Sequence, residues 1–447
     1  MIVTAADPYV AEFERFDESR PDDPSWLRAT RQQALARFTS LGFPTTRQEE
    51  WRFTNVAPIA DAAFRLPLDG GELRAEHPAA WRFGRGDVLE IVFVNGRFSP
   101  HLSALDAAPE GLSVRSLSAV LSAGSRSAAA HLAHHAKFED QPFVALNTAF
   151  LADGALVEIG PNTVVDRPVH IVFVASGAGT MSHPRVLVVA GRNSQAQIVE
   201  SYVGSDDDAG VPHGLTSRAN TFTNAVTEIV LDDGAVVEHY RAQRERGRSY
   251  HVSSTFARLA HSATFSSHAF TFGGAIVRND VNVLLAGAGS DATLNGLYLA
   301  DGSRLVDNHT FIDHAQPHCG SHEVYKGVLG GKARAVFNGK ILVRPDAQKT
   351  DAKQTNKTLL LSDDAQINTK PQLQIFANDV KCTHGATVGQ LSADALFYLQ
   401  SRGIDRRTGQ QMLVRAFAAD ITSRVRIESL REQLDIVLLE ALQGSSE

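Results

Sequence analysis

The residues best suited to chemistry in this sequence are a cysteine and a histidine separated by one residue, Cys382-Thr383-His384. Thiolate and imidazole groups are both ligands of transition metals. In a β-strand, successive side chains point to opposite faces, so residues two apart project from the same face about two rises apart. If this segment is a strand, Cys382 and His384 can therefore reach one metal ion.

A denser group of candidate ligands precedes this pair, within fourteen residues: His309, His314, His318, Cys319 and His322. The spacings His-x4-His, His-x3-His and Cys-x2-His match no closed structural zinc site well. The simpler interpretation is that some of these side chains stack inside a β structure and form hydrogen bonds. The chain has only two cysteines, which cannot supply the four thiolates that an iron-sulfur cluster usually takes. Any cluster must therefore be completed by another chain.

The segment before Cys382 has the two-residue period of a strand, with alternating side chains at residues 372–377. Pro371 stands just before this alternation. Proline cannot donate a hydrogen bond to a sheet, so we expect it at the beginning of the strand. Asn378-Asp379 predicts a corner, after which residues 380–387 continue as a second strand that carries Cys382 and His384.

Short β-rich runs recur from about residue 143 to residue 389, and small turns of Gly, Asp, Asn or Ser separate them. No stretch of this region has a convincing amphipathic helix, which excludes a parallel sheet built through helical crossovers. An antiparallel sandwich and a parallel β-helix remain. The corners lack hairpin turns of the Asn-Gly type, so the pattern favours a β-helix of about ten turns with roughly 25 residues in each.

The N-terminal region, residues 1–140, is predicted to be mostly helical. Ser25 is the expected N-cap of one helix, which ends at Gly42-Phe43-Pro44. Residues 46–54 form a charged segment with two aromatic side chains, and we expect it to pack rather than to bind a ligand.

The C-terminal region, residues 390–447, is also predicted to be helical, after a β-helix that occupies residues 141–389. Ser392 and Asp405 are the expected N-caps of its first two helices. About fifty residues of amphipathic helix cannot form a large core of their own. These helices must therefore dock on the β-helix or on a partner.

Composition excludes several classes of function. The formal net charge of -7 argues against a nucleic-acid-binding surface, and the arginines at residues 241–248 are interpreted as a solvated loop. No run approaches about 18 apolar residues and the N-terminus lacks an apolar signal core, so we expect a soluble cytoplasmic protein with reduced thiols. There is no Gly-x-x-x-x-Gly-Lys-Ser/Thr motif, so the chain should not hydrolyse ATP. The glycine pattern at residues 287–292 precedes a strand rather than a helix, so it predicts no dinucleotide site.

Nine segments of the chain together resemble the SufB/SufD family of the SUF machinery for iron-sulfur cluster assembly. They are residues 46–54, 307–311, 325–329, 337–339, 347–351, 356–361, 369–373, 379–389 and 397–404. The resemblance covers residues 25 to 440 and is densest beyond residue 305. Members of the SufB type typically carry more cysteines and lack the Cys-x-His pair, so the sequence resembles the SufD type more closely.

The resemblance implies a right-handed parallel β-helix between helical terminal regions, pairing with the SufB scaffold, and docking of the SufC ATPase on the C-terminal helices. In the family, the histidine that matches His384 is tied to cluster formation at the interface with SufB, and Cys382 lies beside it in the same motif. We therefore expect a non-catalytic scaffold subunit. Its His384, with Cys382, would bind iron or a transient iron-sulfur cluster shared with the partner.

Three alternatives stay open at this point. The chain could be a SufB-type cluster scaffold, a β-helix enzyme acting on carbohydrates, or a structural homodimer that binds no metal. The carbohydrate enzyme predicts a signal peptide and a cluster of carboxylates on the side of the β-helix. The residues leave open the cluster type, the iron donor and the participation of a flavin.

Overall fold

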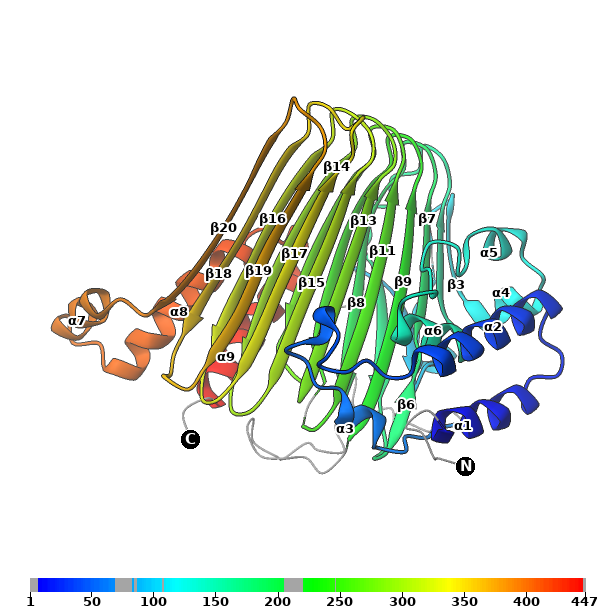
Figure 1. Ribbon diagram of the computed structural model, residues 1–447, viewed down its shortest axis with the longest axis horizontal. Helices are drawn as coiled ribbons and strands as arrows, with labels where there is room; N and C mark the ends of the chain where they lie inside the picture. Colours follow the sequence, from blue (N-terminus) through cyan, green and yellow to red (C-terminus); the bar gives the residue numbers. More distant parts are fainter. Residues whose placement is uncertain are drawn as a thin grey trace.

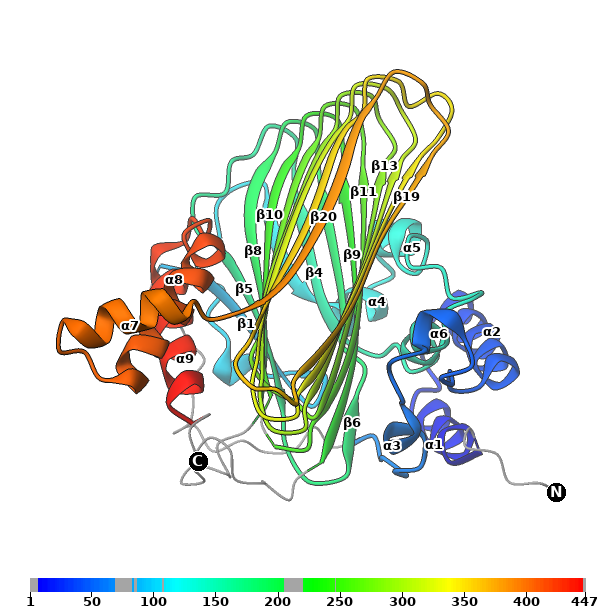
Figure 2. The same cartoon turned by 60° about the vertical axis from the view of Figure 1, so that its left-hand side comes forward.

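Two mainly parallel β-sheets face each other and form a parallel β-helix of about eight turns in the computed structural model (Figures 1 and 2). The structure describes residues 7–68, 83, 87–106, 108–204, 220–245 and 247–444. The first sheet contains, in spatial order, β2 (Arg97–Phe98), β1 (Leu89–Val94), β5 (Val169–Ala175), β8 (Gln195–Gly204), β10 (Val236–Arg244), β12 (Thr264–Thr271), β14 (Asp291–Ala300), β16 (Gly320–Leu329), β18 (Asp351–Leu360) and β20 (Lys381–Gln390). The second contains β19 (Gln366–Ile375), β17 (Arg334–Val343), β15 (Leu305–His314), β13 (Ile276–Leu285), β11 (Tyr250–Leu259), β9 (Thr221–Leu231), β7 (Arg185–Ala190), β4 (Gly154–Ile159) and β3 (Leu112–Ser116), with β6 (Thr180–Ser182) beside β9.

The turns of the β-helix are stacked in register. Asp291, Gly320, Asp351 and Lys381 are aligned on consecutive strands of the first sheet. Each turn is therefore longer than the roughly 25 residues expected from the sequence, and there are about eight turns rather than ten. The reason is that strands such as β14, β16 and β18 are ten residues long and include inward-facing polar residues that the apolar pattern does not reveal.

The predicted parallel β-helix is confirmed, whereas three local expectations within residues 141–389 are wrong. Helix α6 (Pro142–Ala149) opens the predicted β region; all its residues are buried, so it has no amphipathic period to recognise. Pro371 lies in the middle of β19, not at its beginning, and is tolerated because β19 is the last strand of its sheet. Arg241 is not in a solvated loop: its guanidinium is inside the β-helix and donates to Ser253 and Asn279.

The N-terminal helices lie on the outer side of the second sheet (Figure 2). They are α1 (Asp7–Glu18), α2 (Ser25–Leu41), η1 (Glu49–Trp51), α3 (Ala57–Ala60), α4 (Leu117–Ser122), α5 (Arg126–His131) and α6. The short η3 (Pro100–Leu102) instead packs on the first sheet, where Leu102 belongs to a buried cluster with Val92 of β1 and Val172 of β5. Ser25 is the first residue of α2 rather than its N-cap, which is Pro24, and Gly42 ends the helix with a positive φ of 65°. Strands β1, β2 and β3 belong to the sheets although they precede residue 141.

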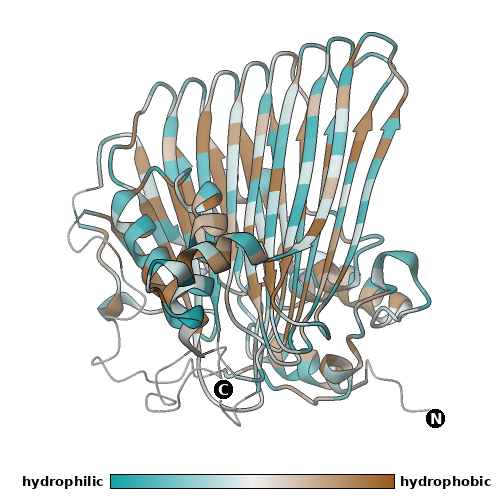
Figure 3. Ribbon diagram, turned by 90° about the vertical axis from the view of Figure 1, so that its left-hand side faces the viewer, coloured by the Kyte–Doolittle hydropathy of each residue, from teal (hydrophilic) through white to brown (hydrophobic). Residues whose placement is uncertain are grey.

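Three helices follow the β-helix: α7 (Ala393–Ser401), α8 (Arg406–Thr422) and α9 (Glu428–Gly444). The predicted N-caps are confirmed, because the side chains of Ser392 and Asp405 accept backbone N–H groups of α7 and α8. Helices α8 and α9 pack on the outer face of the first sheet (Figure 3), where Ile421 and Leu434 belong to the same buried cluster as Leu297. Helix α7 projects from this cluster (Figure 1). None of the described helices is both long and apolar enough to cross a membrane.

Candidate functional site

The predicted ligand pair lies on the last strand of the first sheet. Strand β20 pairs with β18, and no other described strand pairs with its outer edge. Cys382 and His384 are the register partners of Ala352 and Gln354, which are buried inside the β-helix. Both side chains therefore lie on the inward face of β20, which covers the end of the β-helix interior. The strand, the preceding corner and the shared face are confirmed; the binding of a metal stays a prediction.

The two candidate ligands differ in exposure. His384 is exposed, whereas Cys382 is half-buried and packs against the core of the β-helix. Burial raises the pKa of the Cys382 thiol, and the nearby charge of Asp351 acts in the same direction. The thiolate is the metal-binding form, so this shift disfavours the form of Cys382 that could bind a metal. His384 is therefore the more accessible of the two candidate ligands.

The interior beneath this pair is polar. Gln354 is 1% exposed, and its Nε2 donates a hydrogen bond of 2.7 Å to Oε2 of Glu323 on the next strand inward, β16. Burial raises the pKa of Glu323 to about 7, although contacts with Thr310 and Gln354 oppose the shift. Neither residue is recognisable from the sequence, because inward positions of β16 and β18 such as Ser321, Glu323, Gln354 and Asn356 are polar rather than apolar.

Replacing Glu323 with glutamine is expected to stabilise the protein at pH 8 and to change little at pH 5. The pKa of Glu323 is raised from 4.5 to about 7, so the folded protein binds this proton more tightly than the unfolded chain does. That stabilising contribution is complete below about pH 4.5 and is lost as the pH rises through 7. Glutamine resembles the neutral acid at every pH, so the gain in unfolding free energy at pH 8 is at most about 3 kcal/mol.

Urea unfolding of both proteins at pH 5 and pH 8 measures this difference. Glu18→Gln, which changes an exposed carboxylate on α1, is the matched control and should give no pH-dependent difference. An equal effect of Glu323→Gln at both pH values would contradict the expected neutralisation of a buried carboxyl group.

The histidine cluster expected from the sequence does not form one site. His314 lies inside the β-helix, where its Nε2 is 2.9 Å from the Ser321 hydroxyl and burial lowers its pKa to about 4. Cys319 is buried at a corner and donates to the Gly287 carbonyl at 3.4 Å. His318 and His322 are exposed, at a corner and on the outer face. Within the described residues, no group of three or more His, Cys, Asp or Glu side chains could hold a metal ion.

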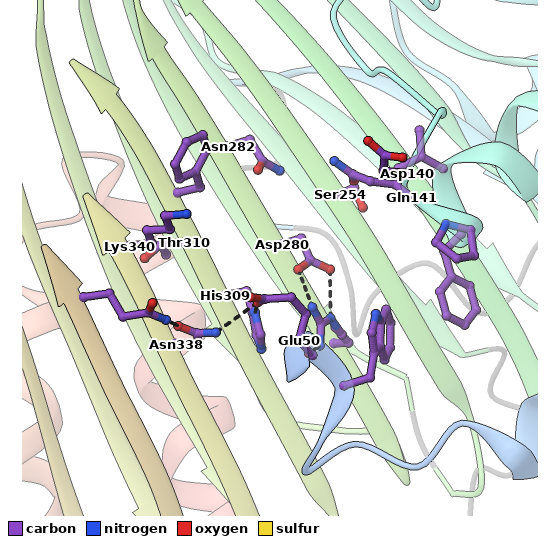
Figure 4. A pocket seen from close by; sticks show the side chains of 17 residues that line it. Glu50, Asp140, Gln141, Ser254, Asp280, Asn282, His309, Thr310, Asn338 and Lys340 are labelled. Atoms are coloured by element: carbon purple, nitrogen blue, oxygen red, sulfur yellow. Dashed lines mark hydrogen bonds and ion pairs between the residues drawn. The ribbon is translucent and has the colours of Figure 1, made fainter. Parts of the chain in front are cut away.

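His309, the remaining member of that cluster, lines a hollow of about 320 Å³ on the outer face of the second sheet (Figure 4). Its imidazole lies 3.3 Å from Glu50 and 3.0 Å from Asp307, and although burial opposes the shift, the charge of Asp307 raises the pKa of His309 to about 9. Arg278 forms ion pairs with Asp307 at 2.8 Å and with Asp280 at 2.9 Å. Each of these carboxylates is thus paired with a cation.

This network fixes the N-terminal segment to the sheet. Arg278 also donates to the Glu50 carbonyl and lies 3.8 Å from the centre of the Trp51 ring. The expected packing of residues 46–54 is therefore confirmed for Trp51 and for the buried Thr54, whereas Phe53, the second aromatic residue of the segment, is 44% exposed. The paired carboxylates do not resemble the free acid and base of a glycoside hydrolase.

The fold and the pair at its end define a class of protein: a parallel β-helix with helical extensions on both sides and a thiol and an imidazole on its terminal strand. Residues 173–417 match the family described as SUF system FeS cluster assembly, SufBD core domain, and residues 6–171 match the SufBD protein N-terminal region. The chain therefore belongs to the SufB/SufD family of the SUF system for iron-sulfur cluster assembly.

Several relatives extend over nearly the whole chain. It is 30% identical over 420 residues to the iron-sulfur cluster assembly protein SufD of Escherichia coli, covering 93% of both chains. It is 34% identical over 419 residues to an iron-sulfur cluster assembly SufBD family protein of Synechocystis, covering 92% of this chain and 90% of the relative. It is 24% identical over 436 residues to SufD of Bacillus subtilis, covering 96% of both.

Proposed function

We propose that this chain is the SufD-type, non-catalytic scaffold subunit of a cytoplasmic SUF assembly complex. It pairs with SufB at the end of the β-helix and docks the SufC ATPase on its C-terminal helices. His384, with Cys382, contributes to iron acquisition and to the nascent iron-sulfur cluster, which is the cargo of the complex. The observation that carries this proposal is the position of Cys382 and His384 on the exposed terminal strand β20.

The end of the β-helix has the properties of a protein interface. Strands β19 and β20 are the last of their sheets, and among the described strands none pairs with their outer edges. Ile375, Phe376 and Val388 are 39%, 63% and 46% exposed there. Unpaired strand edges with exposed apolar side chains favour pairing with another chain. A partner strand added at this edge would lie beside His384.

The ligand count also requires a partner. Cys319 is buried at a corner, which leaves Cys382 and His384 as the ligands that this chain offers at the interface. An iron-sulfur cluster usually takes four protein ligands, and histidine can replace cysteine in some of them. SufB would therefore supply the remaining thiolates.

Co-expression with SufB and SufC tests this function. The purified complex is expected to contain iron and acid-labile sulfide, whereas the chain purified alone should contain neither in stoichiometric amount. Failure of the three proteins to co-purify, or a complete cluster on the isolated chain, would contradict the proposal.

A further inference from the structure

A buried glutamine lies directly inside His384. Gln354 and His384 are register partners on the adjacent parallel strands β18 and β20. Adjacent strands are about 4.8 Å apart, so side chains of partners on the same face are neighbours. The first interior side chain beneath the His384 imidazole is therefore that of Gln354.

Two other residues, Glu323 and Gly339, determine the orientation of the Gln354 amide. Glu323, its register partner on β16, accepts a hydrogen bond of 2.7 Å from the amide nitrogen Nε2. Gly339 on the opposite sheet leaves the room that the amide needs: a Cβ atom at that position would lie 2.1 Å from Nε2. A larger residue at 339 would displace the glutamine, so this placement depends on the glycine.

This orientation leaves the amide oxygen of Gln354 without a partner. Oε1 is buried and has no hydrogen bond to any described residue. Buried acceptors in proteins are nearly always paired, so an unpaired one requires an explanation. The imidazole of His384 lies next to Gln354, on the side of the open end of the β-helix. A ring N–H group of His384 can donate the hydrogen bond that Oε1 of Gln354 lacks.

We propose that Gln354 and Glu323 are positioning residues for His384, an inference that rests on the proposed function of His384 as a metal ligand. Oε1 of Gln354 accepts the N–H of one ring nitrogen, which leaves the other nitrogen unprotonated and available to the metal. In metal sites the partner of the second ring nitrogen fixes the tautomer in this way. Glu323 determines that Gln354 presents its oxygen rather than its NH2 group.

The tautomer of His384 is directly measurable. In the chain labelled with 15N-histidine at pH 8, the His384 ring signals, identified by their absence in His384→Ala, are expected to report one dominant tautomer. In Gln354→Leu, which has a similar volume but no acceptor, the two tautomers should be comparably populated. Gln366→Leu, an exposed outward position on β19, is the matched control and should leave the signals unchanged. If Gln354→Leu does not fold, Gln354→Met, whose side chain is unbranched, is used in place of the leucine variant.

Iron binding gives the second measurement. Anaerobic titration of the complex with Fe²⁺ should show an affinity about 10- to 100-fold lower in Gln354→Leu than in the wild type, the range found for lost partners of ligating histidines. An unchanged tautomer in Gln354→Leu would overturn the positioning role. If the tautomer changes but neither Gln354→Leu nor His384→Ala alters iron binding, the hydrogen bond stands and the proposed function of His384 fails.

Discussion

Replacing His384 with alanine is expected to remove most of the iron and acid-labile sulfide from the complex with SufB and SufC, while the fold and the pairing with SufB are retained. The side chain is exposed on β20, and substitutions at exposed positions usually change stability by less than about 0.5 kcal/mol. A buried, hydrogen-bonded histidine would instead cost about 1 to 3 kcal/mol. Loss of the cluster without loss of stability therefore separates a ligand from a structural residue.

The same measurement on Cys382→Ala should show a weaker form of the defect, because this thiol is half-buried and its pKa is raised. Thr387→Ala is the matched control, since Thr387 is exposed on the same strand but points to the opposite face. Iron, sulfide and melting temperature are measured for each complex. A His384→Ala complex that melts normally and still assembles a full cluster would show that His384 is not required.

Replacing both Phe397 and Tyr398 with serine is expected to abolish co-purification of SufC and to leave pairing with SufB unchanged. These aromatic side chains on the projecting helix α7 are 73% and 59% exposed. Buried aromatic anchors commonly contribute at least about 2 kcal/mol each to an interface, which corresponds to roughly 30-fold in affinity. SufC that still binds the double variant at wild-type stoichiometry would exclude α7 as the docking element.

Point substitutions are a more selective test than removal of residues 392–447. Helices α8 and α9 bury their apolar faces against the first sheet, and Lys326 of β16 binds the Phe417 carbonyl at 3.0 Å and Asp420 at 2.8 Å. Deletion would expose this cluster and destabilise the β-helix as well as remove the docking surface. Ile436→Ser, at a position on α9 that is 55% exposed, is the matched control and should retain SufC.

Local structural features of the chain could be predicted from its sequence. The small-residue corners predicted a β-helix, the alternation at 372–377 and the Asn378-Asp379 corner placed Cys382 and His384 on one face of a strand, and Ser392 and Asp405 predicted two helix starts. Each of these signals depends on residues close together in the chain, because strand period, corner chemistry and helix capping are short-range effects. The sequence therefore determined the architecture and the candidate ligands.

The surroundings of those ligands were decided by tertiary structure alone. Strand register places Glu323 beneath Gln354 and Gln354 beneath His384, although about 30 residues of chain separate each from the next. The fold likewise brings Glu50 to His309 and distributes the other histidines between the interior, a corner and the outer face. In the sequence, polar residues at inward strand positions cannot be distinguished from loop residues. Their burial and their hydrogen-bond partners come from the opposite sheet, so their roles depend on contacts between segments that are distant in the chain.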